Sequence, residues 1–270
     1  MAKVAAVGVL ERNHVVVSGT PGAQPMLFAH GFGCDQQMWR FVTPAFEDFH
    51  VVCFDHVGAG RSDLTAYDPA RYATLDGYAT DVLEICEALE LEDVVFVGHS
   101  VAAMMGVLAA NREPSRFAGL VLVGPSPRYI DDAGYVGGFS ADDIDELLGS
   151  LDSNYLGWSQ AMAPVIMGHP DRPELGDELT ESFCRTEPTI AKRFARATFL
   201  SDNRSDLASV SVPTLVLQCR NDVIAPIDVG RYVADRIAGS EFVILDTTGH
   251  CPNLSAPAAT IEAIAAFVRR

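Results

Sequence analysis

Basic residues are scarce in this chain. It has 19 Lys and Arg against 36 Asp and Glu among its 270 residues, so its formal net charge is 19 − 36 = −17 at pH 7. An excess of negative charge repels the phosphate backbone of nucleic acids and gains nothing from anionic membrane surfaces. We therefore expect neither nucleic acid nor a membrane as a partner.

The cysteines show none of the spacings that bind metals or cross-link small secreted domains. The six cysteines form no CxxC pair and no His/Cys cluster of zinc-site spacing. Cys53 and Cys219 lie inside apolar runs, where cysteine behaves as a small buried hydrophobe. Free thiols fit a reducing cytoplasm better than a disulfide scaffold. We expect a cytoplasmic protein without a metal site.

Long apolar runs are also missing. The short apolar stretch at the N-terminus is interrupted by Glu11 and Arg12, which makes it too short for a signal peptide. No run approaches the roughly 20 residues that span a bilayer. Because 49% of the residues are hydrophobic and 20% are charged, the chain has the composition of a folded globular protein.

What the first half of the chain does contain is an alternation of short apolar runs and helix-period segments. The solid apolar runs are typical of strands covered on both faces of a parallel sheet. Helices are expected over 75–89 and 101–111. Strands are expected over 14–18, 26–30, 50–55, 94–99 and 119–124. This order predicts a doubly wound α/β domain with a mostly parallel sheet.

The alternation stops after Pro125 and returns near residue 213. The segment 127–206 has no strong strand signal, and it contains four helix-like stretches, over 141–151, 153–167, 179–186 and 188–200. Beyond it we expect strands over 213–219 and 241–246 and helices over 228–237 and 256–268. We interpret 127–206 as a helical lid inserted into a core formed by 1–126 and 207–270.

Ser100 lies at the strongest chemical signal in the sequence. The apolar run that begins at Val94 ends in Gly98-His99-Ser100-Val101-Ala102, and a predicted helix follows. A sharp strand-to-helix turn of small residues exposes the serine hydroxyl above the sheet in hydrolases with the pattern G-x-S-x-G. Here Ala102 replaces the last glycine. The alternative is an ordinary serine N-cap on a buried helix.

Two further residues complete a possible triad. His250 follows the strand expected over 241–246, and Asp222 follows the strand expected over 213–219. Asp228 and Asp246 are rival acids, and each of these loop residues alone also fits a packing or turn role. Together, Ser100, Asp222 and His250 follow the chain order Ser…Asp…His, each at the carboxyl end of a strand. This order predicts a serine nucleophile, a histidine base and an orienting acid.

The segment His30-Gly31-Phe32-Gly33 follows another expected strand. A serine nucleophile needs hydrogen-bond donors for the developing oxyanion, which in this fold are the backbone N–H after the nucleophile and one from an early loop. We assign these donors to Val101 and Phe32.

With these residues, the sequence resembles the α/β-hydrolases related to the bacterial stress-signalling hydrolase RsbQ and to the plant karrikin and strigolactone receptors. The resemblance runs through nearly the whole chain, and its lid segments are the most specific part. The segments that carry it are HGFGCDQQMW (30–39), FDHVGAGRSD (54–63), GHSVAAMMG (98–106), SPRYIDDAGYVGGF (126–139), SNYLGW (153–158), FARATFLSDNRSDL (194–207), LQCRNDVIAP (217–226) and GHCP (249–252).

The resemblance implies an α/β-hydrolase fold with a four-helix, V-shaped lid over an apolar pocket. It carries Ser100, Asp222 and His250 over as the triad. We also expect His99 in the pocket. The positions that match the family's pocket lining are Phe32, Phe139, Trp158, Met162 and Phe199. Packing within the lid is the alternative role for each of these large apolar residues.

We expect a serine hydrolase, carboxylesterase-like, that cleaves a small, mostly apolar ester, lactone or enol ether through an acyl-enzyme, with no cofactor. The alternative is a signalling protein that senses a small ligand, turns it over slowly and engages a protein partner through the lid surface, as the resemblance to RsbQ implies.

Overall fold

A seven-stranded sheet forms the centre of the computed structural model, which describes residues 8–270. Its strand order is β1-β3-β2-β4-β5-β6-β7, and every neighbouring pair is parallel except β1 with β3. The strands are β1 (Val16–Gly19), β2 (Pro25–Ala29), β3 (His50–Cys53), β4 (Val94–His99), β5 (Phe117–Val123), β6 (Thr214–Asn221) and β7 (Glu241–Thr248). The expected mostly parallel, doubly wound sheet is confirmed.

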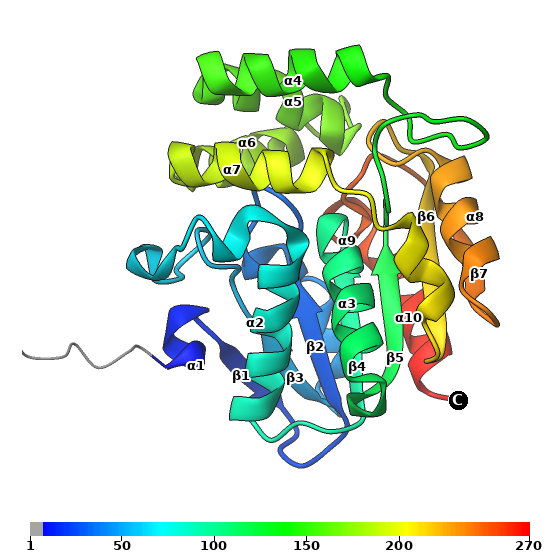
Figure 1. Ribbon diagram of the computed structural model, residues 1–270. Coiled ribbons are helices and arrows are strands. Elements are labelled where there is room, and N and C mark those ends of the chain that lie inside the picture. The colour runs from blue at the N-terminus through cyan, green and yellow to red at the C-terminus, as the bar shows by residue number, and fades with distance from the viewer. Residues whose placement is uncertain (1–7) are drawn as a thin grey trace, which may run out of the picture.

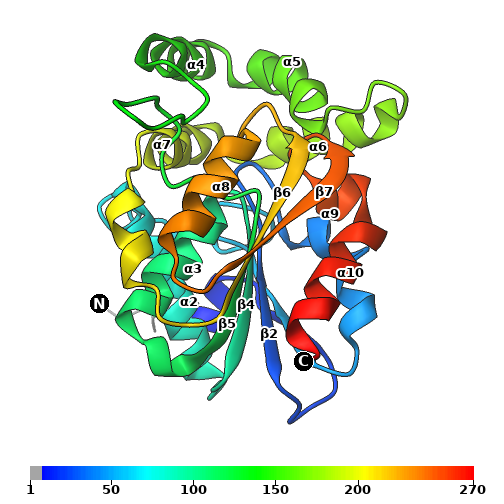
Figure 2. The same ribbon diagram turned by 90° about the vertical axis from the view of Figure 1, so that its right-hand side faces the viewer.

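Helices cover both faces of this sheet. Figure 2 shows α2, α3 and α8 on one side of the sheet and α10 on the other. Both faces are apolar, and β4 is buried along its whole length. The helices outside the lid are α1 (Val9–Arg12), α2 (Leu75–Ala88), α3 (Val101–Arg112), α8 (Ile227–Arg236), α9 (Pro252–Ser255) and α10 (Pro257–Val268).

Four helices lie above one end of the sheet (Figure 1). The chain enters them after β5 and returns to the sheet through β6. They are α4 (Ala141–Ser153), α5 (Tyr155–Met167), α6 (Pro173–Arg185) and α7 (Pro188–Phe199), and we call them the lid helices. Because the strands from β2 to β7 are parallel, their carboxyl ends meet at the edge that faces the lid helices.

The helix boundaries differ from the sequence-based expectation in three places. The third lid helix begins at Pro173 rather than at residue 179, because Pro173 occupies the first turn, where its missing N–H costs nothing. The short helices α1 and α9 were not expected. Pro257 begins α10 after a break that separates it from α9, so the closing helix expected over 256–268 is confirmed as α10.

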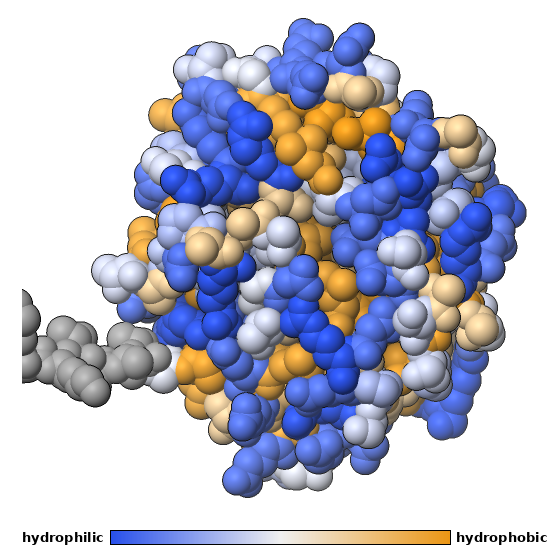
Figure 3. Space-filling view, in the orientation of Figure 1, coloured by the Kyte–Doolittle hydropathy of each residue, from blue (hydrophilic) through white to orange (hydrophobic). Residues whose placement is uncertain are grey.

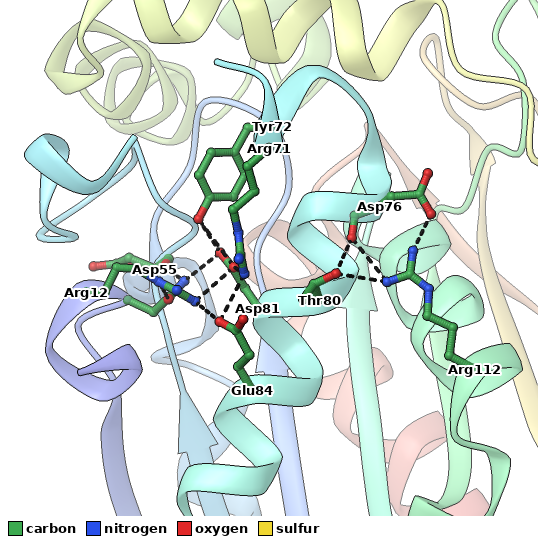
Figure 4. A network of polar contacts seen from close by, with 10 residues as sticks. Arg12, Asp55, Arg71, Tyr72, Asp76, Thr80, Asp81, Glu84 and Arg112 are labelled. Carbon is green, nitrogen blue, oxygen red and sulfur yellow. Dashed lines mark hydrogen bonds and ion pairs between the residues drawn. The ribbon is translucent and has the colours of Figure 1, made fainter. Parts of the chain in front are cut away.

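A buried ion cluster on α2 fixes the start of the chain against the sheet (Figure 4). Asp81 is fully buried and pairs with Arg12 at 2.9 Å, and Arg71 also contacts the same carboxylate. Burial raises the pKa of the Asp81 carboxyl, and the two arginines oppose that rise. Asn13 joins the cluster to the loop after β3 by donating to the carbonyl of Asp55 at 3.1 Å.

Three expectations concern features outside the fold itself. The prediction that the chain lacks a signal peptide rests partly on residues 1–7, which lie outside the described residues. Among residues 8–270, no helix has the length and apolar character that crossing a membrane requires. All six cysteines carry free thiols, as expected.

Candidate active site

Ser100 sits in a strained turn between β4 and α3. Its backbone has φ 57° and ψ −125°, a conformation that L-residues adopt only where the surroundings impose it. A Cβ on Gly98 would lie 2.7 Å from the carbonyl of Ala102, so glycine is needed where the helix passes the strand. Ser100 occupies the N-cap position of α3 but makes no side-chain capping bond. Its hydroxyl is therefore free for another partner.

That partner is His250. The Ser100 hydroxyl lies 2.7 Å from Nε2 of His250, and Nδ1 of His250 lies 2.7 Å from Oδ2 of Asp222. The other carboxylate oxygen of Asp222 accepts from the backbone N–H groups of Ile224 and Ala225, at 2.8 and 3.1 Å. Asp222 thus fixes the imidazole so that Nδ1 carries the proton and Nε2 faces the serine.

The rival acids lie elsewhere. Asp246 is exposed and pairs with Arg220 at 2.6 Å, while Asp228 lies in the first turn of α8. Neither has a hydrogen bond to His250. Of the three aspartates weighed from the sequence, only Asp222 reaches the histidine.

The loop after β2 brings Phe32 close to Ser100. A Cβ on Gly31 would lie 3.2 Å from Cβ of Ser100, so this loop passes directly against the serine. Neither the Phe32 N–H nor the Val101 N–H donates to another group of residues 8–270. Both groups remain available as donors, as the sequence argument requires.

Two buried histidines hold this loop. The Nδ1–H of His30 donates to the carbonyl of Gly31 at 2.9 Å, because its Nε2 accepts from the backbone N–H of His56. The Nε2–H of His56 donates back to the carbonyl of His30 at 2.8 Å. Burial lowers the pKa of both imidazoles, so both stay neutral near pH 7.

A cavity with about 510 Å³ of empty space, open in part to solvent, lies over Ser100 and below the lid helices. Five of the six positions expected in the pocket line it, namely Phe32, His99, Trp158, Met162 and Phe199. The Phe32 ring packs against Trp158 at 6.2 Å and Phe199 at 6.0 Å between ring centroids.

Phe139 is the exception, because the structure does not place it in the lining of this cavity. Its backbone pairs with the segment that follows β5: its N–H donates to Tyr129, and its carbonyl accepts from Asp131. This pairing keeps Phe139 packed against the apolar core. Tyr129, its pairing partner, lines the cavity instead.

Tyr129 and Thr198 are two hydroxyl-bearing residues of the lining that the sequence reasoning missed. Burial raises the pKa of the Tyr129 phenol. Both residues fall inside segments quoted for the family resemblance, SPRYIDD and FARATF. No spacing rule marked them, because a loop and one face of a helix place them there.

The lid also contacts His250 directly. The backbone N–H of His250 donates to the carbonyl of Ile166, near the end of α5, at 2.9 Å. A Cβ on Gly249, which has φ 90°, would overlap the carbonyl of Met167. On the core side, Nε2 of His99 contacts the His250 carbonyl at 2.7 Å. The backbone of His250 is therefore held from both sides of the cavity.

Charge is nearly absent from the lining. Burial lowers the pKa of His99 to about 3, so this imidazole is neutral. No lysine or arginine lines the cavity. Within residues 8–270, no group of three or more His, Cys, Asp or Glu is arranged to hold a metal ion.

The chain matches the model of the alpha/beta hydrolase family over residues 26–263. It is 39% identical to a strigolactone esterase of Arabidopsis thaliana, over 97% of each chain. It is 38% identical to a karrikin insensitive 2 receptor of Petunia hybrida, over 95% of this chain and 96% of the other. A solved hydrolase from Oleispira antarctica superposes with a TM-score of 0.94 at 41% identity, over 97% of this chain and 96% of that one. The chain therefore belongs to the alpha/beta hydrolase family and is similar to its karrikin and strigolactone receptor branch.

Proposed function

We propose that Ser100, His250 and Asp222 hydrolyse a small, mostly apolar ester, lactone or enol ether through an acyl-enzyme. The observation that carries the proposal is the continuous hydrogen-bonded chain from the Ser100 hydroxyl through His250 to Asp222, with both links at 2.7 Å. Its position on the floor of an apolar cavity supports a neutral, small substrate.

In the first half of the reaction with an ester or lactone, Ser100 attacks the carbonyl carbon of the substrate. His250 Nε2 takes the serine proton as Oγ forms its bond, and Asp222 stabilises the imidazolium. The N–H groups of Phe32 and Val101 donate to the oxygen that gains negative charge. Collapse of this tetrahedral species breaks the bond to the alcohol, which leaves with the proton from His250.

In the second half, water replaces the alcohol. His250 takes a proton from the water while its oxygen attacks the acyl carbon, and the same two N–H groups hold the oxyanion again. The bond to Ser100 then breaks, and His250 returns the proton to Oγ. The acid is released and the triad is restored.

The test is hydrolysis of para-nitrophenyl acetate by the Ser100→Ala variant. We expect kcat/KM to fall by about 1,000-fold or more with the melting temperature retained, because only the nucleophile is lost. Ser159→Ala is the matched control, since it removes a buried hydroxyl that donates to Tyr155 and does not line the cavity. Activity that persists in Ser100→Ala would refute the proposal. Active-site titration of the wild type checks that the measured activity belongs to this protein.

A second function is supported by the receptors among the relatives. In it, the same triad turns over a ligand slowly, and the lid helices then engage a protein partner. Apolar side chains on α5, including Leu156 and Val165, are half exposed, and Figure 3 shows apolar surface at the level of the lid helices. Fewer than about one turnover per minute, with a ligand-dependent rise in melting temperature, would favour the receptor over the ordinary esterase.

A further inference from the structure

Four hydroxyls on the helices of this protein satisfy their hydrogen bond in the same way. Ser159, Thr80, Thr180 and Thr260 each donate to the backbone carbonyl four residues earlier, at 2.8 to 3.1 Å. Thr198 on α7 does not. Its side chain is 1% exposed, and its hydroxyl has no hydrogen-bond partner among residues 8–270.

Thr198 lies in the wall of the cavity that contains Ser100. Phe194 precedes it by one helical turn and Phe199 follows it, and both rings pack against Phe32, at 5.6 and 6.0 Å between centroids. The unpaired hydroxyl is therefore on the part of α7 that faces the loop carrying the expected oxyanion donor.

A buried hydroxyl without a partner loses its hydrogen bonds to water and gains nothing in return. Such a group is retained at little net cost when a bound ligand supplies the partner. We propose that Thr198 determines specificity by hydrogen bonding to an additional oxygen of the substrate, separate from the carbonyl that Ser100 attacks. This inference rests on the proposed hydrolase function and narrows its substrate class.

The lining limits what that oxygen can be. No lysine or arginine lines the cavity to pair with a carboxylate or phosphate, and Nε2 of His250 is already engaged with Ser100. Most of the remaining lining is hydrocarbon. A neutral ether, hydroxyl or carbonyl oxygen fits, because a threonine hydroxyl can both donate and accept. The substrate class is an apolar ester or lactone with one further neutral oxygen.

The test compares esters that differ only by oxygen in place of a methylene. On the acyl side the pair is para-nitrophenyl methoxyacetate and para-nitrophenyl butyrate; on the alcohol side it is methoxyethyl acetate and butyl acetate, followed by acid release. Each is measured with the wild type, Thr198→Val, Thr198→Ser and Thr180→Val. Thr180→Val is the matched control, because that hydroxyl is bonded to its own helix and does not line the cavity.

We expect Thr198→Val to lower kcat/KM for the oxygen-containing member of at least one pair by roughly tenfold, and to change its methylene partner by less than about twofold. Thr198→Ser keeps the preference, and Thr180→Val leaves both pairs unchanged. The melting temperature of Thr198→Val should equal or exceed that of the wild type, because valine removes an unpaired hydroxyl.

Two results would overturn the inference. One is a Thr198→Val variant whose rates for both members of each pair change equally or stay the same. The other is a large fall in its melting temperature, which would give the hydroxyl a structural role. Failure of the proposed function looks different: the wild type would then hydrolyse none of the four esters faster than Ser100→Ala does.

Discussion

The two sides of the cavity differ in how their polar side chains are hydrogen-bonded. The strand ends lie below the cavity, and the lid helices lie above it. On the strand side, every side chain of the proposed triad has a partner: Ser100 meets His250, and Asp222 is held by His250 and two backbone N–H groups. On the lid side the wall is mostly rings and aliphatic groups, and its hydroxyl at Thr198 is unpaired. The hydrogen bonds on the strand side hold the side chains in the fixed positions that a reaction requires. The lid side leaves a hydroxyl that a ligand can bind.

The difference has a local cause. The strand-side residues lie in loops that begin where a strand of the sheet ends, so neighbouring backbone groups fix them within a few residues of the sheet. The lid residues lie on amphipathic helices that contact one another through side chains. Trp158 of α5 stacks on Phe183 of α6 with 5.7 Å between ring centroids. Such contacts are less directional than hydrogen bonds.

The replacement Asp222→Asn should have the largest effect on activity of the changes that test this comparison. The carboxylate oxygen held by Ile224 and Ala225 would remain an amide oxygen, so the NH₂ group would face Nδ1 of His250. The imidazole would then carry its proton on Nε2 and could not accept one from Ser100. We expect kcat to fall by about 10⁴-fold, with KM and melting temperature nearly unchanged, as measured by steady-state kinetics and calorimetry.

Asp246→Asn is the control for this prediction. It removes an exposed acid of the same strand-end region, paired only with Arg220, and should leave kcat within about twofold of the wild type. Equal losses in the two variants would contradict the assignment of Asp222.

The strand side was also the part that the sequence could predict. The run from Val94 to Ser100 contains the strand, the turn and the proposed nucleophile in consecutive residues, so local rules are enough to bring them together. Asp222 and His250 needed only the assumption that parallel strands end at one edge. The fold class follows from the same apolar runs.

The lid side could be predicted only in outline. Helix-period patterns placed α4, α5 and α7, but the first turns of α6 were missed although Pro173 marks their start. Phe139 and Tyr129 lie in one irregular loop, and backbone pairing decides which of them reaches the cavity. The unpaired hydroxyl of Thr198 depends on a tertiary position that no periodicity encodes.

A smaller effect is a loss of folding stability in acid, which should come from residues on the strand side of the cavity. His30, His56 and His99 are buried there, and burial lowers the pKa of each, that of His99 to about 3 from 6.5. The folded protein therefore binds these protons less readily than the unfolded chain. Stability is complete above pH 6.5 and is lost as the pH falls toward 3, by about 2 kcal/mol at pH 5 for His99 alone.

Urea unfolding at pH 7.5 and pH 5 measures this loss. His99→Gln should lose less stability between the two pH values than the wild type, because one titrating group is gone. The raised pKa of Asp81 acts in the opposite direction but is the same in both proteins. A wild type that is equally stable at both pH values, or a variant with an unchanged pH dependence, would contradict the assignment.

The smallest effect concerns how the lid is attached. Arg40, on the core side, makes a two-point ion pair with Glu178 of α6, at 2.6 and 2.7 Å. Both side chains are about one-third exposed, so solvent screens the pair. If the lid is held mainly by apolar packing, the coupling between Arg40→Gln and Glu178→Gln in a double-mutant cycle should be about 0.5 kcal/mol and should fall further in high salt. A coupling above about 2 kcal/mol would mean that the ion pair, rather than apolar packing, holds the lid helices on the core. The difference between the strand side and the lid side of the cavity would then need another explanation.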